Sequence, residues 1–254
     1  MALEKIIFNY LLIFIFAVSI LVFIILFFIP APYGKFTRRE WGLRANPKIA
    51  WFIMELPAVI VILICFFSGN KVTNPVAIVF LSLWLLHYIQ RTFFYPFLQK
   101  SNKDTFPILL IVFSILFNGL NGYLNGRYLF YFSEDYSISW FTDPRFIIGI
   151  IIFLSGYIIN LNSDYILRNL RSPGEHTYKI PVGGLFRYIS SPNYFGEMIE
   201  WIGWAILTWS LPGFAFAVFT IANLAPRAIA SHRWYLKTFS DYPKKRKAII
   251  PFIY

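Results

Sequence analysis

The chain has 254 residues, of which 58% are hydrophobic, 21% aromatic and 14% charged, and its mean hydropathy is +0.60. Soluble domains are about a quarter charged, so the composition excludes an ordinary soluble domain and indicates an all-α, polytopic membrane protein made of one helical domain. Cys65 is the only cysteine, which excludes intramolecular disulfides and cysteine metal clusters.

Apolar runs predict seven transmembrane helices, at about 7–30, 49–68, 75–96, 106–124, 144–164, 195–211 and 213–236. The first run is too long for a signal-peptide core and lacks a basic leader and a cleavage site, so we expect no cleavable signal peptide. It carries no ionisable group and is expected to face lipid.

Positive charge follows the expected topology. Of the 23 Lys and Arg residues, 19 fall in alternate loops, and the others are Lys5, Lys71, Arg127 and Arg145. The positive-inside rule places the N-terminus outside and the C-terminus in the cytoplasm, an inversion that seven spans require. The net charge of +11 therefore gives no indication of nucleic-acid binding. We expect a multi-pass protein of the endoplasmic reticulum membrane in a eukaryote, or of the inner membrane in a bacterium.

The second and third spans carry a candidate catalytic pair, Glu55 and Tyr88. A carboxylate inside a span is a functional candidate by default, although Glu55 could instead pair with a loop arginine. Tyr88 offers an acidic O–H in an apolar setting, or it belongs to an interfacial aromatic belt. A haem role for His87 would need an opposing histidine at the same depth of another span, and the other two histidines are His176 in a loop and His232 near the tail.

The fourth span combines amides with glycines. A polar face lies beside a small face because each glycine follows an asparagine: Asn118-Gly119, Asn121-Gly122 and Asn125-Gly126. Small residues and amides favour close helix packing, and lining a polar cofactor pocket is the alternative. The segment 128–146 is expected to be an outer loop.

A polar stripe begins at the end of the fifth span. Asn160, Asp164, Arg168 and Arg171 recur at spacings of four, four and three, so on a helix they share one face. The start of the sixth span adds Asn193, a possible helix cap, and Glu197, and the last span adds Arg227 and Tyr235. Such a stripe needs a buried, multivalent polar partner, and a phosphorylated cofactor is suitable.

The two polar clusters suit two different ligands. Arginines pair with phosphates while amides and carboxylates bind ribose, so the later cluster suits a dinucleotide, and its several arginines favour NADPH. The Glu55 and Tyr88 cluster suits an apolar substrate with one carbonyl, whose developing enolate oxygen a Tyr O–H and a neighbouring carboxyl can stabilise. Together they predict conjugate hydride addition to an enone. The sequence has no Rossmann, P-loop or metal-binding motif, and no metal is expected.

Seven motifs carry a resemblance over nearly the whole chain. They are MELP (54–57), HYIQRTFFYP (87–96), NGYLNG (121–126), NLNSDYILRNLR (160–171), YKIPVGGLFRYISSPNYFGEMIEWIGWA (178–205), TWSLPGFAFA (208–217) and YLKTFSDYPKKRKAIIPFIY (235–254). The chain resembles the steroid 5α-reductase family, the 3-oxo-5α-steroid 4-dehydrogenases. The resemblance implies seven transmembrane helices, NADPH, and reduction of the carbon 4–5 double bond of a 3-oxo steroid.

The resemblance also implies roles for individual residues. Glu55 and Tyr88 would hold the 3-oxo oxygen, with Trp51 and Met54 as further substrate contacts. Residues 1–130 would then lie mainly on the substrate side and 144–254 on the cofactor side. The expected cofactor contacts are Asn160, Asp164, Arg168, Arg171, Tyr178, Asn193, Glu197, Arg227 and Tyr235.

The chain departs from the expected family pattern at several positions. Met54 stands where a glutamine is expected, Ser231 stands where a histidine is expected, and Gln99 and Asn102 lie in a loop that does not align cleanly. Three other functions remain open: a polyprenol or enoyl-lipid reductase, a membrane isoprenoid or sterol methyltransferase, and a non-enzymatic transporter or lipid scaffold. Steroid and lipid bilayer are the expected partners, and no protein partner is implied.

Overall fold

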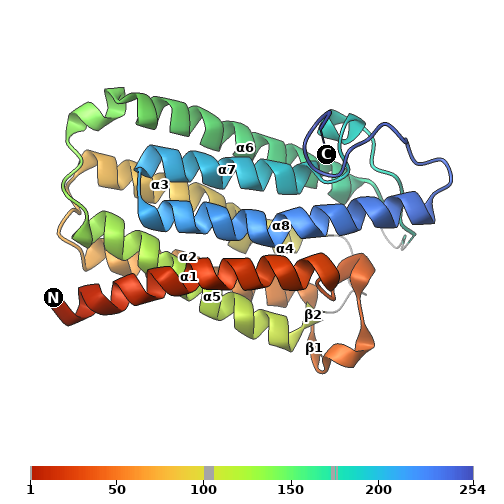
Figure 1. Ribbon diagram of the computed structural model, residues 1–254, viewed down its shortest axis with the longest axis horizontal. Coiled ribbons are helices and arrows are strands. Elements are labelled where there is room, and N and C mark those ends of the chain that lie inside the picture. The colour runs from red at the N-terminus through yellow and green to blue at the C-terminus, as the bar shows by residue number, and fades with distance from the viewer. Residues whose placement is uncertain (1, 100–105, 173–174, 176, 254) are drawn as a thin grey trace. The chain divides into compact units, whose positions relative to one another are not determined.

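The computed structural model describes residues 2–99, 106–172, 175 and 177–253, so Asn102 lies outside the described residues. Helices make up most of it (Figure 1). They are α1 (Ala2–Phe28), α2 (Pro47–Phe67), α3 (Pro75–Ile89), α4 (Tyr95–Leu98), α5 (Ile108–Arg127), α6 (Pro144–Asn169), α7 (Pro192–Thr208) and α8 (Leu211–Thr238). Two short antiparallel strands, β1 (Arg44–Ala45) and β2 (Phe106–Pro107), pair Arg44 with Pro107 and Ala45 with Phe106.

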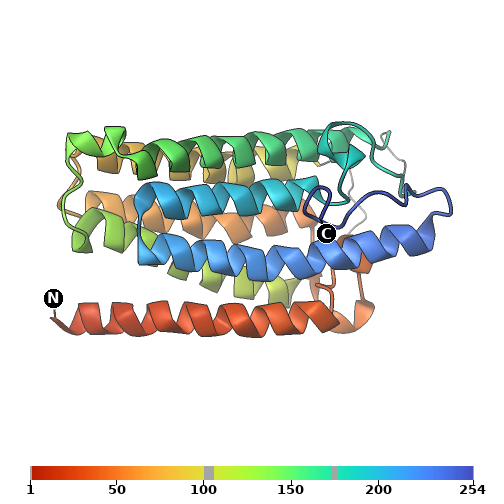
Figure 2. The same ribbon diagram turned by 45° about the horizontal axis from the view of Figure 1, so that its top comes forward.

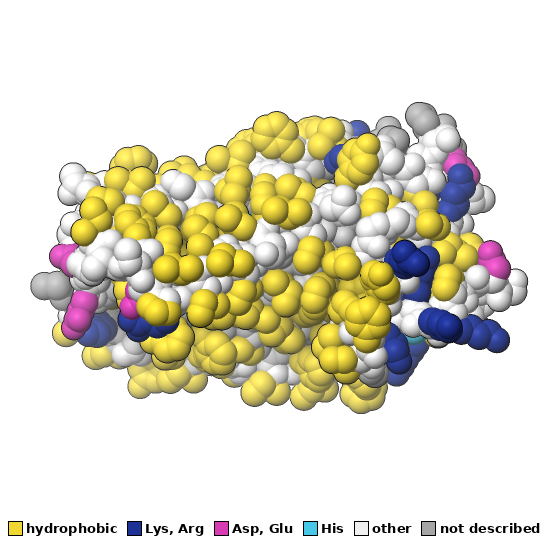
Figure 3. All heavy atoms as spheres, turned by 90° about the horizontal axis from the view of Figure 1, so that it is seen from above, with side chains coloured by type: hydrophobic (Ala, Val, Ile, Leu, Met, Phe, Trp, Pro, Cys, Tyr) yellow, Lys and Arg dark blue, Asp and Glu magenta, His cyan; other side chains and the backbone are white. Residues whose placement is uncertain are grey.

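Six described helices are long and apolar enough to cross a membrane: α1, α2, α3 with its continuation to Leu98, α5 with its continuation to Phe132, α6 and α8. Hydrophobic side chains cover much of the helix surface on the face drawn in Figure 3. Large hydrophobic side chains are also exposed on α1, where Ile13 is 64% exposed and Phe14 is 55% exposed. This supports a multi-pass membrane protein. The remaining expected span, at 195–211, corresponds to α7. Because α7 has only 17 residues, the count of seven spans stays a prediction.

The expected outer loop at 128–146 is wrong in part. The helical path of α5 continues through a π-helical turn at Tyr128–Phe132, and a 3₁₀ helix follows at Ile138–Thr142. The wider turn is marked by a hydrogen bond from the Ser133 N–H to the Tyr128 carbonyl, five residues back. Leu129 and Phe130 are fully buried, so apolar packing holds the turn helical where composition indicated a loop.

The third span is interrupted in the same way. A π-helical turn at Gln90–Phe94 joins α3 to α4, and the Tyr95 N–H bonds the Gln90 carbonyl. Pro96 follows directly and has no N–H to give to the helix ladder. The turn therefore lets the span continue past a residue that would otherwise break it.

The chain divides into two compact units. Unit 1 is Met1–Leu12 with Pro32–Ile147, and unit 2 is Ile13–Ala31 with Ile148–Tyr254. Each unit is described by itself below.

In unit 1, α5 packs closely on α2 through glycine. A Cβ added at Gly126 would lie 2.7 Å from the Cβ of Cys65, and one at Gly122 would lie 3.3 Å from the Cβ of Val61. A Cβ at Gly119 would meet nothing within 4 Å. The small face expected from the sequence is therefore confirmed for Gly122 and Gly126 and wrong for Gly119.

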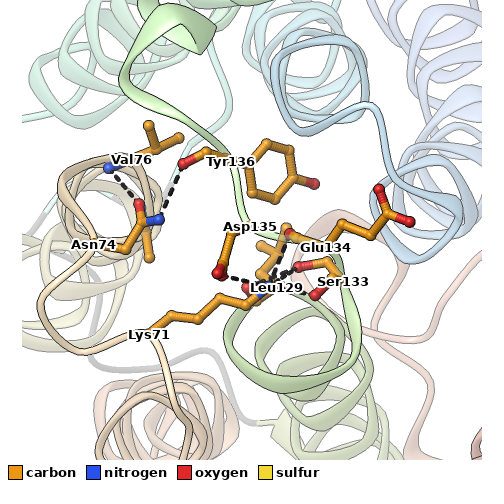
Figure 4. A network of polar contacts seen from close by, with 9 residues as sticks. Lys71, Asn74, Val76, Leu129, Ser133, Glu134, Asp135 and Tyr136 are labelled. Carbon is orange, nitrogen blue, oxygen red and sulfur yellow. Dashed lines mark hydrogen bonds and ion pairs between the residues drawn. The ribbon is translucent and has the colours of Figure 1, made fainter.

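A buried lysine ties two loops of unit 1 together (Figure 4). Lys71 is 4% exposed, and its Nζ donates to the Ser133 carbonyl, to Ser133 Oγ at 2.7 Å and to the Glu134 carbonyl at 2.8 Å. Burial lowers the pKa of Lys71, while the nearby Asp135 carboxylate opposes that shift. Asn74 adds a second link by donating to the Tyr136 carbonyl at 3.0 Å. The loop after α2 is thus held to the segment after α5.

In unit 2, α6 and α7 touch along their backbones. The contact uses one pair of glycines seven residues apart on each helix, Gly149 and Gly156 on α6, Gly196 and Gly203 on α7. A Cβ at Gly196 would lie 2.6 Å from the Asn160 nitrogen, closer than real Cβ contacts come. The two helices therefore lie as near as bare backbone allows.

We expect opposite outcomes for two alanine substitutions on α5. Gly126→Ala places a methyl group against the Cys65 side chain. Overpacking of this kind costs about 1–3 kcal/mol, and each kcal/mol should lower the apparent Tm by about 2–4 °C. Gly119→Ala has free space and gains helix propensity, so the Tm should hold or rise. Thermal unfolding of the purified chain, followed by tryptophan fluorescence, measures both. Equal Tm values for the two variants would contradict the packing described above.

Candidate active site

Glu55 lies half-buried on α2 and is held by an amide from α5. Asn118 Nδ2 donates to Glu55 Oε2 at 3.2 Å and to the Met54 carbonyl at 2.7 Å. Both N–H bonds of this amide therefore have acceptors, and Asn118 is only 6% exposed. The hydrogen bond from Asn118 to Oε2 fixes the orientation of the Glu55 carboxyl group.

Tyr88 lies at the same level as Glu55. Trp84 Nε1 donates to the Ala58 carbonyl at 3.1 Å, and the rings of Trp84 and Tyr88 lie 4.9 Å apart. The seven-residue connection at 68–74 makes α2 and α3 antiparallel neighbours. Trp84 in α3 contacts Ala58 in α2, and the two helices run in opposite directions. Tyr88, one turn after Trp84, therefore lies at about the same depth as the residues one turn before Ala58, which include Glu55. Tyr88 is 3% exposed.

Aromatic rings surround a buried arginine near the start of α2. The Arg91 guanidinium lies 4.1 Å from the Tyr95 ring and 5.1 Å from the Trp51 ring, in cation–π contact with both. Trp51 also packs against a core cluster that contains Met54 and Phe106. The structure thus brings Trp51 and Met54, both expected as substrate contacts, into one apolar group.

In unit 2, three of the expected residues form one hydrogen-bonded group. Asn160 on α6 is 3% exposed, and its Nδ2 donates to the Asn193 carbonyl at 3.0 Å and to Glu197 Oε2 at 3.4 Å. The cap assigned to Asn193 is wrong, because Ser191 occupies the cap position and Pro192 the first turn of α7. Asn193 instead lies inside the helix and presents its carbonyl to α6.

Arg227 on α8 contacts a residue that the sequence analysis missed. Its Nη2 donates to the Tyr194 hydroxyl at 3.2 Å, and the guanidinium lies 5.1 Å from the centre of that ring. Tyr194 directly follows Asn193 in the quoted 178–205 motif. Its place beside a candidate residue was the only signal in the sequence.

A chain of ring contacts joins three more expected residues. The Arg171 guanidinium lies 5.2 Å from the Tyr178 ring, the Tyr178 ring lies 5.1 Å from Trp234, and Trp234 lies 5.2 Å from Tyr235. These contacts link the segment after α6 to the end of α8.

The remaining two expected residues lie apart from this chain of rings. Asp164 is buried at 6% exposure. The Arg168 guanidinium lies 5.6 Å from the ring of Tyr165, which is 58% exposed, so Arg168 turns toward the open side of α6.

Arg246 is the most informative residue that the sequence analysis missed. It is 6% exposed, and its Nε and Nη1 have no hydrogen-bond partner among the described residues. Its guanidinium lies 5.2 Å from the ring of Tyr242, which stacks on Tyr235 at 5.1 Å and 9°. A buried guanidinium without an acceptor is costly, and the arrangement therefore calls for an anion.

The basic run at 244–247 concealed this residue. In the sequence the run is typical of a solvated or headgroup-facing patch, and its three lysines, Lys244, Lys245 and Lys247, are indeed exposed. Arg246 alone turns inward. A turn at 244–245, closed by a hydrogen bond from the Arg246 N–H to the Pro243 carbonyl at 3.1 Å, precedes this residue, and charge composition does not reveal which side chain such a turn directs inward.

Buried polar groups lie inside the apolar helices of a membrane protein, and comparison with known proteins identifies its family. The family described as 3-oxo-5-alpha-steroid 4-dehydrogenase matches residues 104–254. Steroid 5-alpha-reductase DET2 of Gossypium hirsutum is 43% identical over 258 residues, which cover 100% of both chains. 3-Oxo-5-alpha-steroid 4-dehydrogenase 1 of Rattus norvegicus is 44% identical over 225 residues, 88% of this chain and 86% of the relative. 3-Oxo-5-alpha-steroid 4-dehydrogenase 2 of Sus scrofa is 46% identical over 228 residues, 89% of each chain.

The chain belongs to the 3-oxo-5-alpha-steroid 4-dehydrogenase family. The resemblance read from the seven motifs is thereby confirmed.

Proposed function

We propose that the protein reduces the carbon 4–5 double bond of 3-oxo-4-ene steroids to give 5α-3-oxo steroids, with NADPH as its cofactor. The observation that carries this proposal is the identity of 43% to 46% with steroid reductases over 88% or more of the chain. The buried Glu55, Asn118 and Tyr88 supply polar groups suited to a ketone in an otherwise apolar setting.

Glu55 and Tyr88 stabilise the charge that develops on the substrate. NADPH, when bound, supplies the hydride that carbon 5 receives. The electron pair of the double bond then moves toward the 3-oxo oxygen, where an enolate forms and carbon 4 later takes a proton. The Tyr88 hydroxyl and the Glu55 carboxyl donate hydrogen bonds to that oxygen, and such donors are worth most in a site without water.

Asn118 acts as a positioning residue for Glu55. Because Oε2 accepts from Asn118 Nδ2 at 3.2 Å, the proton of a protonated Glu55 resides on Oε1. The amide thus selects which carboxyl oxygen can donate to the substrate and holds it in place.

The residues of unit 2 fit a phosphorylated dinucleotide. The group formed by Asn160, Asn193 and Glu197 offers the amide and carboxylate atoms that bind sugar hydroxyls and a carboxamide. Arg171, Arg227 and the unpaired Nε and Nη1 of the buried Arg246 offer donors for phosphate oxygens. Asp164, Arg168, Tyr178 and Tyr235 are the remaining proposed contacts.

We also propose α7 as the seventh span, with the N-terminus outside and the C-terminus in the cytoplasm. Its 17 residues reach about 25 Å, close to the hydrocarbon core of about 30 Å, and it contacts α6 through backbone. Three of the four cations expected outside have carboxylate partners: Lys71 with Asp135, Arg127 with Glu4 and Arg145 with Asp143. A cation whose charge is balanced by a carboxylate adds little net positive charge, as expected for loops on the outer side of the membrane.

Turnover of a 3-oxo-4-ene steroid with NADPH, read as the 5α product by mass spectrometry, tests the activity. Tyr88→Phe removes the hydroxyl donor, and Glu55→Gln replaces the acidic carboxyl O–H with a much less acidic amide N–H. Each should lower kcat about 10²–10³-fold, while the Kd for NADPH stays unchanged. Normal turnover in both variants would refute the assigned donors. NADPH binding without steroid product would direct the search to polyprenols or enoyl lipids, and failure to bind NADPH would favour a methyltransferase.

Asn118→Leu should lower kcat about tenfold, since a hydrogen bond to a carboxyl group is worth about 1.5–3 kcal/mol, without changing the Kd for NADPH. A double-mutant cycle with Glu55→Ala, which removes the acceptor of the Asn118 amide, separates positioning from folding. If Asn118 acts through Glu55, the Leu substitution should add little in the Glu55→Ala background. Independent, additive losses would show that Asn118 serves another purpose.

Arg246→Gln should raise the Kd for NADPH at least tenfold, because a charged donor to phosphate is lost. The Tm without NADPH should hold or rise, since an unpaired buried charge is removed. Lys245→Gln, one residue away and exposed, is the matched control and should leave both quantities unchanged. A fall in Tm with an unchanged Kd would mean that Arg246 is purely structural.

A further inference from the structure

A second pocket in unit 2 lies between α8 and the C-terminal tail. Its volume is about 210 Å³, and it is lined by Ile229, His232, Arg233, Lys247, Ala248 and Ile253. Figures 1 and 2 show the tail turning back from the end of α8 toward the start of α7. Nothing in the proposed reaction uses this pocket.

The pocket faces away from the proposed cofactor contacts of α8. With 3.6 residues per turn, Arg227 and Tyr235 lie on one side of the helix. Ile229 and Arg233 lie on roughly the opposite side, and His232 lies between the two sides. The pocket is therefore distinct from the site proposed for NADPH.

The walls of the pocket are built by hydrogen bonds. The Lys247 N–H donates to the Tyr188 carbonyl and the Ser190 N–H donates to the Lys247 carbonyl, each at 2.9 Å. The Ser190 hydroxyl lies 2.6 Å from His232 Nδ1 and 2.7 Å from the Tyr242 hydroxyl. One buried serine thus joins α8, the tail and the segment before α7, so the pocket is preformed.

Its polar lining is cationic. Arg233 and Lys247 are both exposed, and neither makes an ion pair with any residue that the structure describes. The only other polar side chain of the lining is His232, and the lining includes no carboxylate. Two unpaired cations at one opening favour an anion, and a guanidinium together with an ammonium matches a phosphate.

The other half of the lining is apolar and continues onto exposed tail residues. Ile229, Ala248 and Ile253 line the pocket, and Ile253 is 73% exposed. Phe252 is 77% exposed and adopts a left-handed backbone with φ of 68°. Exposed apolar groups beside basic ones are typical of a segment lying at a membrane surface.

We propose that this pocket binds the phosphate group of an anionic membrane phospholipid, with Arg233 and Lys247 on the phosphate and Ile229 and Ile253 on the adjoining glycerol and acyl carbons. A small inorganic anion would leave the apolar half of the lining unused. A zwitterionic lipid such as phosphatidylcholine also has a phosphate, but its choline cation would be repelled by the two cations of the lining.

Lipid binding to the full chain in a neutral detergent tests the proposal, with native mass spectrometry counting bound lipids during titration. The probes are dioleoyl phosphatidylglycerol, dioleoyl phosphatidylcholine and inorganic phosphate. Phosphatidylglycerol should bind as one tight lipid and the other two much more weakly. Phosphatidylcholine binding as tightly as phosphatidylglycerol, or phosphate binding as tightly as the lipid, would overturn the assignment.

Matched charge variants locate the site. Arg233→Gln with Lys247→Gln should weaken phosphatidylglycerol binding about tenfold or more. Lys244→Gln with Lys245→Gln removes the same charge from the same tail outside the pocket and should change binding less than about twofold. Equal losses in the two pairs would mean diffuse attraction and refute a defined site. The charged side chains of Arg233 and Lys247 are both exposed, so their loss should not affect folding. An unchanged Tm without lipid confirms that the variants are folded.

Discussion

A polar side chain enclosed by apolar helices has to find a partner, because lipid and hydrocarbon side chains offer none. This constraint explains most of the polar contacts. The Glu55 carboxyl receives the Asn118 amide, and the Asn160 amide is shared between α7 groups. Lys71 is surrounded by carbonyl and hydroxyl oxygens. A few buried atoms of the described residues depart from this rule, among them Thr92 Oγ1, Asn121 Nδ2 and the Nε and Nη1 of Arg246. At Arg246 a positive charge is involved, and we infer that a ligand completes it.

The helices that carry these groups pack closely because glycines, which have no side chain, lie at their contacts. The α6 and α7 backbones meet at glycines, and the same contact puts Asn160 within reach of the first two turns of α7. In unit 1 a smaller version of this contact brings α5 against α2 and Asn118 against Glu55. A short asparagine side chain can bridge two helices only when no bulky side chain separates them. Close backbone approach is therefore what allows these buried amides to find hydrogen-bond partners.

The sequence was sufficient for features that depend on local pattern. Hydropathy located the apolar helices, and helical spacing placed Asn118 on one polar face with Asn121 and Asn125. What failed depended on packing. The π-helical turn at Tyr128–Phe132, with Leu129 and Phe130 buried, replaces part of an expected loop, and the inward turn of Arg246 was concealed in a run of lysines. The sequence left open whether the amides of α5 pack helices or line a site. The structure answers this for Asn118, which bonds both backbone and the candidate acid.

The glycines of the α6 and α7 contact have a consequence for inherited variation. Every missense change at Gly149, Gly156, Gly196 or Gly203 adds at least a Cβ, and each of these positions already has another backbone at contact distance. No single-nucleotide substitution can introduce a residue smaller than glycine. Any missense change at these four codons therefore forces one of the two helices to move, whereas Gly119 has open space for a side chain. A harmful allele can arise at such a position without touching a single atom that binds ligand.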